Sequence, residues 1–225
     1  MLDGSDDGLS PREAALARYA TVLTARPWAV GRADVDDLAA QGFTPEQIEA
    51  ATGVVAMFNY FTRVADASGI DFDYASPLPR FRIERDRDAV ARPPRDSWPD
   101  IPPAPPFPSF DAVREAWTRW HAYVLDSDAP LPRGTRLLLA RAAAEECCDR
   151  RRADELSAHA PATEAEHALD AFARDLSRTP WRMTPAHLDS LRRTGLPEPA
   201  ILHAISVVAH QNSDSRRTLA HAAAS

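Results

Sequence analysis

One segment of this 225-residue chain occurs twice. Residues 16–69 align with residues 169–222 at a constant offset of 153 positions, without a gap and with 17 identities in 54 positions. The shared landmarks are a Pro-Trp pair and a turn glycine, namely Pro27-Trp28 and Gly42 in the first copy and Pro180-Trp181 and Gly195 in the second. Repeats of this kind pack together because neither copy buries its apolar face alone. The repeat therefore predicts one fold built from two matching segments.

Helix signals dominate the rest of the chain. Ser10, Thr44 and Thr163 are each followed three residues later by Glu or Gln, the pattern of a capping box at a helix start. Alternating strand patterns are scarce, and only FRIER near Phe81 fits a short strand. We therefore predict an all-α fold. The expected helices lie near 11–25, 34–41, 45–68, 110–126, 134–158, 164–177, 186–194 and 198–222.

The prolines divide the chain. Ten of the 20 prolines fall between Pro77 and Pro108. Proline removes a backbone donor and disfavours helix at the preceding residue. We predict an N-terminal helical half-repeat over 1–74 and an extended connector over 75–108. A C-terminal unit over 109–225 carries a cysteine-bearing helix and the second repeat.

Composition excludes several classes of protein. The net charge is −7 and no basic block stands out, which argues against nucleic acid as a partner. No run approaches the ~18–20 apolar residues of a membrane span, and the acidic N-terminus lacks a signal pattern. We therefore expect a cytoplasmic protein without a membrane partner. All cations are arginine, so the absence of lysine excludes Schiff-base chemistry.

Two polar residues recur on the apolar long helix of each copy. Asn59 and Arg63 of the first copy return as Asn212 and Arg216. Helical periodicity puts both asparagines on the packing face, where an unbonded amide costs ~1–3 kcal/mol. We interpret the four residues as structural: each asparagine fixes a neighbouring loop or helix end, and each arginine pairs an acid. A direct catalytic role is the alternative.

The opposite faces of the two long helices differ. The first copy has Val54, Met57, Phe58, Phe61 and Val64, whereas the second has Val207, His210, Gln211, Asp214 and Arg217. A helix that is apolar all round must be buried all round. We predict that the Val54–Val64 segment is covered on both sides, by the C-terminal unit or by a second subunit. The Val207–Arg217 segment should keep a solvent-exposed polar face.

Trp28 and Trp181 are expected to close the core of their repeats, with stacking on a ligand as the alternative.

The repeat frame resembles a known superfamily. The patterns L-T-x-x-P-W, A-D-V-x-x-L-x-x-x-G-F-T-x-x-x-I and V-V-A-x-F-N-x-x-x-R-V-A are similar to those of the alkylhydroperoxidase D-like and carboxymuconolactone decarboxylase superfamily, closest to its "peroxidase-related" branch. The resemblance covers roughly 12–73 and 131–222. It implies an all-α fold, a homo-oligomer, for which we expect a dimer, and reduction of a small peroxide by a cysteine thiolate with a thiol reductant. We expect no metal and no cofactor.

The segment LLLARAAAEECCDRRRADEL should carry that chemistry, but its motif is degenerate. The redox members have C-x-x-C, whereas Cys147 and Cys148 are adjacent, and the glutamates Glu145 and Glu146 directly precede them. The catalytic hypothesis is a Cys147 or Cys148 thiolate with one of these glutamates as proton shuttle. The alternative is a buried apolar cysteine beside one at the helix edge, within a charge run that forms a solvated helix face.

Two further hypotheses stay open. A non-catalytic relative would use the scaffold for ligand binding or assembly. A carboxymuconolactone decarboxylase-like enzyme would need acid–base groups, and only His121, His159 and the Glu145–Glu146 pair offer them. The last helix also carries a line of titratable groups, His203, His210, Asp214 and His221. This line predicts a polar outer face, a pH-sensitive contact or a proton relay. A metal site is disfavoured because only His210 and Asp214 are close enough to share an ion.

Overall fold

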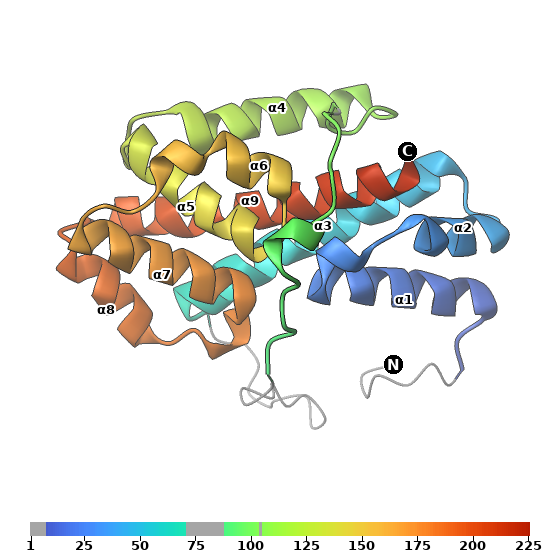
Figure 1. Cartoon of the computed structure of the whole chain (residues 1–225), viewed down its shortest axis with the longest axis horizontal. Helices are drawn as coiled ribbons and strands as arrows, with labels where there is room; N and C mark the ends of the chain where they lie inside the picture. The colour runs from blue at the N-terminus through green and yellow to red at the C-terminus, as the bar shows by residue number, and fades with distance from the viewer. Residues whose placement is uncertain (1–7, 71–87, 104) are drawn as a thin grey trace.

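The structure, a computed structural model, describes residues 8–70, 88–103 and 105–225. Every regular element in these residues is helical, so the predicted all-α class is confirmed (Figure 1). The α-helices are α1 (Pro11–Ala25), α2 (Arg32–Ala40), α3 (Pro45–Ser68), α4 (Asp111–Asp126), α5 (Arg133–Glu146), α6 (Arg150–Glu155), α7 (Glu164–Arg178), α8 (Pro185–Arg193) and α9 (Glu198–Ala224). The short strand considered near Phe81 and part of the 75–108 connector lie outside the described residues.

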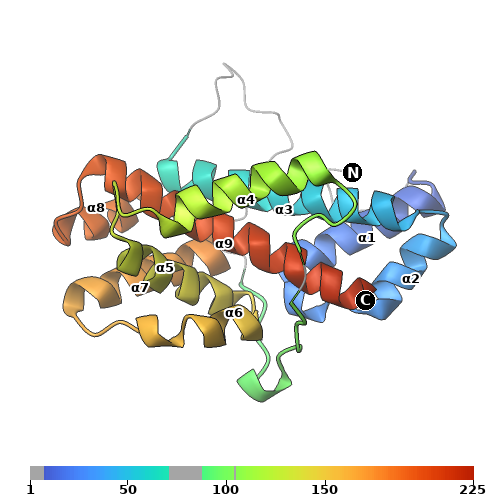
Figure 2. The same ribbon diagram turned by 90° about the horizontal axis from the view of Figure 1, so that it is seen from above.

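Short 3-10 turns join the helices: η1 (Pro27–Ala29), η2 (Arg95–Ser97), η3 (Ser157–His159) and η4 (Pro180–Arg182). The two long helices α3 and α9 run antiparallel, side by side, through the centre (Figure 1). Helices α1 and α2 flank one end of this pair and α5 to α8 flank the other, while α4 lies along one side (Figure 2). The bounds of α7, η4 and α8 follow those of α1, η1 and α2 at the 153-residue offset of the sequence repeat.

The helix starts follow the sequence signals. Ser10 Oγ accepts from the Glu13 amide, and the Glu13 carboxylate accepts from the Ser10 amide at 2.8 Å. The capping boxes at Thr44 and Thr163 are also formed. Gly42 and Gly195 adopt left-handed backbone conformations, with φ of 80° and 86°, in which a side chain would be strained.

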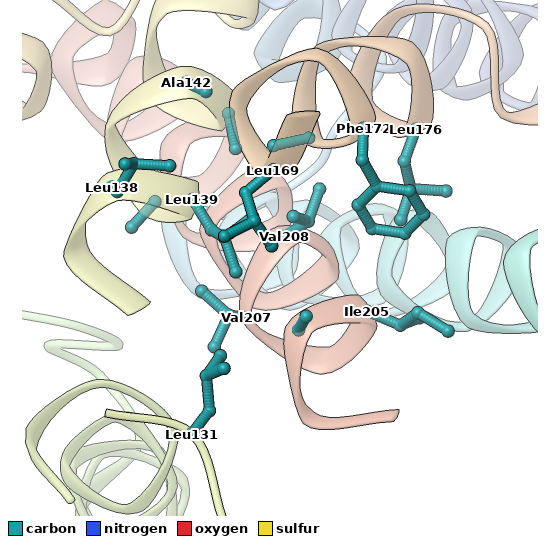
Figure 3. Close-up of a cluster of buried hydrophobic side chains, with 14 of the residues drawn as sticks. Leu131, Leu138, Leu139, Ala142, Leu169, Phe172, Leu176, Ile205, Val207 and Val208 are labelled. Atoms are coloured by element: carbon teal, nitrogen blue, oxygen red, sulfur yellow. The ribbon is translucent and has the colours of Figure 1, made fainter. Parts of the chain in front are cut away.

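The largest apolar core lies between α5, α7 and α9 (Figure 3). Leu138 and Leu139 of α5 meet Leu169 and Phe172 of α7 and Val208 of α9. A smaller core joins α1, α2 and the start of α3. Among the described residues, no helix is both long and apolar enough to cross a membrane.

The single helix predicted over 134–158 is wrong. Helix α5 ends at Glu146 and α6 begins at Arg150. Cys148 takes a left-handed conformation with φ of 56°, and Asp149 starts α6 by accepting the Arg152 amide at 3.0 Å. Non-glycine residues rarely adopt this conformation, so no glycine announced the break in the sequence. The cysteines therefore lie at a helix junction.

The expected burial of the two long helices is reversed. The side chains of Val54, Met57, Phe58 and Phe61 are 44–59% exposed, so the C-terminal unit does not cover this face of α3. The face of α9 expected to be wet, Val207 to Arg217, is buried. Helix α4 packs along α9 and brings its own polar groups to that face. Cover by a second subunit stays a prediction for α3.

Candidate functional site

Hydrogen bonds of Asn59 and Arg63 join α3 to α1, in the half of the molecule formed by the first repeat copy, and to α7, in the half formed by the second. We call this set of bonds the α3 clasp. Asn59 Nδ2 donates to Thr24 Oγ1 at 3.1 Å and to the Val55 carbonyl at 2.9 Å. Arg63 Nη1 donates to the Asn59 side-chain oxygen, and Nη2 donates to the Ser177 carbonyl, both at 2.9 Å. Because Ser177 lies in α7, Arg63 crosses from the first half to the second.

Asn212 and Arg216 of α9 form an equivalent set of hydrogen bonds, the α9 clasp. Asn212 Nδ2 donates to Ser177 Oγ at 2.7 Å and to the Val208 carbonyl at 2.9 Å. Arg216 Nη1 donates to Asn212 Oδ1 at 3.0 Å, and Nη2 donates to the Thr24 carbonyl at 2.9 Å. Thr24 and Ser177 occupy matching positions of the repeat. Arg63 of the first copy therefore binds the end of α7, and Arg216 of the second copy binds the end of α1.

An acid was expected beside each arginine, and Asp66 is near enough to Arg63 for its charge to oppose the fall in the Arg63 pKa. Among the described residues, the hydrogen-bond acceptors of Arg63 and Arg216 are carbonyl and amide oxygens and one thiol, with no carboxylate. Both arginines are only 4% exposed. Burial, and then the nearby Arg216 charge, lower the pKa of Arg63 to about 9. Two buried cations thus lie close together, and Asp66 is the carboxylate whose charge acts on Arg63.

The two clasps line a cavity of about 730 Å³. Trp28 and Trp181, from the two Pro-Trp turns, line it together with Arg63 and Arg216. Both tryptophans are half-buried, and Trp28 packs against the apolar cluster of Trp98, Ala144, Cys148 and Ala153, as expected of a residue that closes a core. We call this cavity the inter-repeat pocket. Its volume lies within the ~300–1,000 Å³ of typical ligand sites.

The glutamates before the cysteines do not form the predicted solvated face. Glu146 lines the inter-repeat pocket and is buried, with Oε1 bound by Arg174 at 3.1 Å and Arg92 at 3.3 Å. Its Oε2 is buried and has no partner among the described residues. Glu145 is held by Arg141 at 2.6 Å and by Arg174 at 2.5 Å. Both glutamates are therefore fixed in a partly buried ionic network.

Both cysteines are buried and unpaired by disulfide. Cys147 Sγ lies 3.4 Å from Asn212 Oδ1 and 3.3 Å from Arg216 Nη1, so it joins the α9 clasp. Burial raises the pKa of Cys147 although Arg216 and Arg63 oppose it, and burial raises the pKa of Cys148 to about 12. No hydrogen bond among the described residues links either sulfur to Glu145 or Glu146. The proposed proton shuttle is therefore not assembled in this structure.

His203, His210 and Asp214 of the α9 line are buried and His221 is half-buried, so the predicted polar outer face is wrong. His210 Nε2 lies 3.0 Å from Nδ1 of His121 on α4, and His203 Nε2 lies 3.3 Å from the Val124 carbonyl. Asp214 pairs with Arg217 at 2.8 Å. Within the described ranges, no cluster of three or more His, Cys, Asp or Glu residues could hold a metal ion.

Burial lowers the pKa of His210 from the ordinary histidine value of 6.5 to about 3. The unfolded chain then binds a proton here at higher pH than the folded chain. The contribution of His210 to stability is therefore complete above pH 6.5 and is lost as the pH falls toward 3.

The acid–base groups of the decarboxylase hypothesis do not form one site. His121 contacts His210, whereas Glu145 contacts Arg141 and Arg174. His159 contributes only its backbone carbonyl to Arg141 in the hydrogen bonds described. No common cluster of these groups is formed among the described residues.

Sequence reasoning missed the most informative part of the site. Thr24 and Ser177 anchor both clasps, and the only signal was a hydroxyl kept at the repeat offset. Arg92, from the proline-rich connector, also lines the inter-repeat pocket and carried no signal. Such contacts depend on where the connector crosses the helices, which composition does not reveal.

Comparisons of the chain with protein-family models, curated proteins and solved structures gave no match. The class defined by fold and site is an all-α protein with two matching Asn-Arg clasps around a central pocket. The resemblance to the alkylhydroperoxidase D-like superfamily continues as a hypothesis. Function is best inferred from the charges and shape of the pocket.

Proposed function

We propose that the protein binds a small organic anion in the inter-repeat pocket. The supporting observation is the pair of buried guanidiniums, Arg63 and Arg216, whose described hydrogen bonds go to neutral oxygens and one thiol. The carboxylates of Asp66 and Glu146 also line the pocket, and Arg174 and Arg92 already bind Glu146. A buried charge costs several kcal/mol unless it is paired. An anion beside the two guanidiniums would lower that cost, so it would bind and stabilise the folded chain.

The pocket wall favours an organic anion over an inorganic one. Trp28 and Trp181 provide aromatic surface, and Pro27 and Pro180 provide further apolar surface. Apolar surface binds the body of a ligand, and a few polar groups orient it. Arginine presents a planar set of donors that matches a carboxylate. A carboxylate on an aromatic or aliphatic body therefore fits best.

This proposal favours the non-catalytic use of a scaffold similar to the alkylhydroperoxidase D-like fold. Thiol-dependent reduction of peroxides or disulfides is the competing proposal. It is favoured by the 3.3 Å contact between Arg216 Nη1 and Cys147 Sγ, because a cation stabilises a thiolate. A Cys147 thiolate would itself be a counter-charge for Arg216 and Arg63. The protonation state of Cys147 therefore separates the two proposals.

The anion proposal predicts charge-selective binding. Benzoate, phenylacetate and octanoate are titrated by isothermal calorimetry, each beside its uncharged primary amide. We expect at least one carboxylate to bind saturably and its amide to bind about tenfold more weakly or not at all, a difference of about 1.4 kcal/mol. Arg63→Met and Arg216→Met should each lower the carboxylate affinity by about tenfold or more.

Arg26→Met is the control, because Arg26 is exposed and does not line the pocket. It should leave carboxylate affinity unchanged. Circular dichroism confirms that each variant is folded, and Arg63→Lys keeps the charge if the methionine variant is unstable. Equal binding of acids and amides, equal loss in the control, or no binding of any carboxylate would each exclude the proposal.

We also propose that a second copy of the chain covers the exposed face of α3. Met57, Phe58 and Phe61 are 44–59% exposed there. The apolar surface continues onto α4, where the Trp120 ring lies edge-on to Tyr60 with centroids 6.2 Å apart. Apolar patches of this kind on a soluble surface commonly mark protein contacts.

Light scattering tests the dimer. We expect a molar mass about twice that of the 24.7 kDa chain, and the monomer mass for Phe58→Glu, because the new charge would have to be buried in the contact. Ala40→Glu places the same charge at an exposed position of α2 and should keep the dimer. A monomeric wild-type chain at all concentrations would refute self-association.

A further inference from the structure

A second cavity, of about 270 Å³, lies between α4, α6 and α9. Arg151 and Arg152 of α6, Arg217 of α9 and His121 and Thr118 of α4 all line it. None of these residues lines the inter-repeat pocket. We call this cavity the α4–α6–α9 cavity. Its polar lining is dominated by hydrogen-bond donors.

Each guanidinium in the cavity keeps a nitrogen free of described protein contacts. Arg151 uses Nη1 to bind Glu155 at 2.7 Å, and Arg152 uses Nη1 and Nε to bind Glu155 and Gln211. Arg217 uses Nη2 and Nε to bind Asp214. Nη2 of Arg151, Nη2 of Arg152 and Nη1 of Arg217 therefore have no partner among the described residues.

The charges of the lining favour an anion. Asp214 and Glu155 together offer two negative charges to the three guanidiniums. Glu155 is shared by Arg151 and Arg152 and is 42% exposed, so solvent weakens its effect. The lining thus keeps a positive balance. Three separate guanidinium donors around a small space match the several acceptor oxygens of a phosphoryl group better than one carboxylate.

His121 provides a further donor. The ring Nδ1 of His210 is buried without a partner among the described residues. An unpaired buried N–H costs more than an unpaired acceptor, so the His210 proton belongs on Nε2, which points at His121 Nδ1. His121 then accepts at Nδ1 and carries its own proton on Nε2. His121 lines the cavity, and we assign this N–H as a donor to a ligand there.

We propose that the α4–α6–α9 cavity binds the phosphoryl group of a small phosphate monoester or free phosphate, held by Arg151, Arg152, Arg217 and His121. Trp117 also lines the cavity and offers an aromatic wall beside the phosphoryl position. An organic group on the phosphate would contact this ring. A monoester with an aromatic body should therefore bind more tightly than free phosphate.

Titration calorimetry at physiological ionic strength tests this site with inorganic phosphate, phenyl phosphate and phenol. We expect saturable binding of both phosphates, tighter for phenyl phosphate, and none of phenol. Arg151→Met should weaken both phosphates by about tenfold. The matched control is Arg150→Met, which removes the same charge from the neighbouring, half-exposed position of α6 that does not line the cavity.

Arg150→Met should change phosphate affinity less than twofold, and Arg63→Met, in the other pocket, should not change it. His121→Phe removes the donor without changing charge and should also weaken binding. If neither phosphate binds the wild-type chain, or if Arg150→Met and Arg151→Met weaken binding equally, the site does not exist. Tighter binding of free phosphate than of phenyl phosphate would exclude the monoester as the preferred ligand.

Discussion

Replacing Arg136 with methionine is expected to lower the free energy of unfolding by roughly 3–5 kcal/mol. The Arg136 side chain is fully buried and donates to four carbonyls, those of Tyr123, Val124, Ala129 and Leu131, at 2.6–2.8 Å. Tyr123 and Val124 lie in the last turn of α4, where carbonyls lack intrahelical partners and favour a cation. Methionine fills similar space but removes the donor of four carbonyls, those of Leu131 and Val124 in buried bonds and those of Tyr123 and Ala129 in part-buried bonds.

Urea unfolding followed by circular dichroism measures this loss. Arg133→Met is the control, because Arg133 opens the same helix but its side chain is 52% exposed and only 3.5 Å from Asp126. The control should change stability by less than about 1 kcal/mol. A loss below about 1 kcal/mol for Arg136→Met would show that water or rearrangement satisfies the carbonyls.

The second large effect is protection of the cysteines. In the folded chain we expect iodoacetamide to label Cys147 and Cys148 at neutral pH about a hundredfold more slowly than in urea. Both side chains are at most 2% exposed, and burial raises the pKa of each thiol. Only the thiolate reacts, so burial and protonation act in the same direction.

Mass spectrometry of Cys148→Ser isolates the rate of Cys147, and Cys147→Ser isolates the rate of Cys148. Labelling of Cys147 at neutral pH as fast as in the unfolded chain would refute protection and favour thiol-dependent reduction. The raised pKa also sets a pH dependence. Because the folded Cys147 thiol keeps its proton above the ordinary cysteine pKa of 9.0, its contribution to stability is complete below that pH and falls as the pH rises above it.

Local signals were enough for most helix ends. The capping hydroxyls of Ser10 and Thr44 and the turn glycine Gly42 act on backbone only a few residues away. The sequence alone therefore predicts these helix starts and this turn. The break at Cys148 depends on a left-handed residue that is not glycine, held by the packing around it. That packing is not visible in a local window.

The candidate site was only partly predictable. The repeat singled out Asn59, Arg63, Asn212 and Arg216, because these polar residues occupy matching positions in two otherwise apolar segments. Periodicity shows which residues share a helix face, but not what covers the face. Helix α4 covers the polar face of α9, while the apolar face of α3 stays exposed. Solvation judged from polarity alone therefore failed for α9, whereas for α3 the predicted cover by a second subunit stays a prediction.

The exchange of arginines between the two halves has a consequence for cooperativity. Arg63 satisfies a carbonyl at the end of α7, and Arg216 satisfies one at the end of α1. If one half detached, its arginine would become exposed to water. The carbonyl that this arginine binds in the other half would lose its hydrogen-bond donor. Neither half completes these hydrogen bonds by itself, so we expect the two halves to unfold together despite the duplicated sequence.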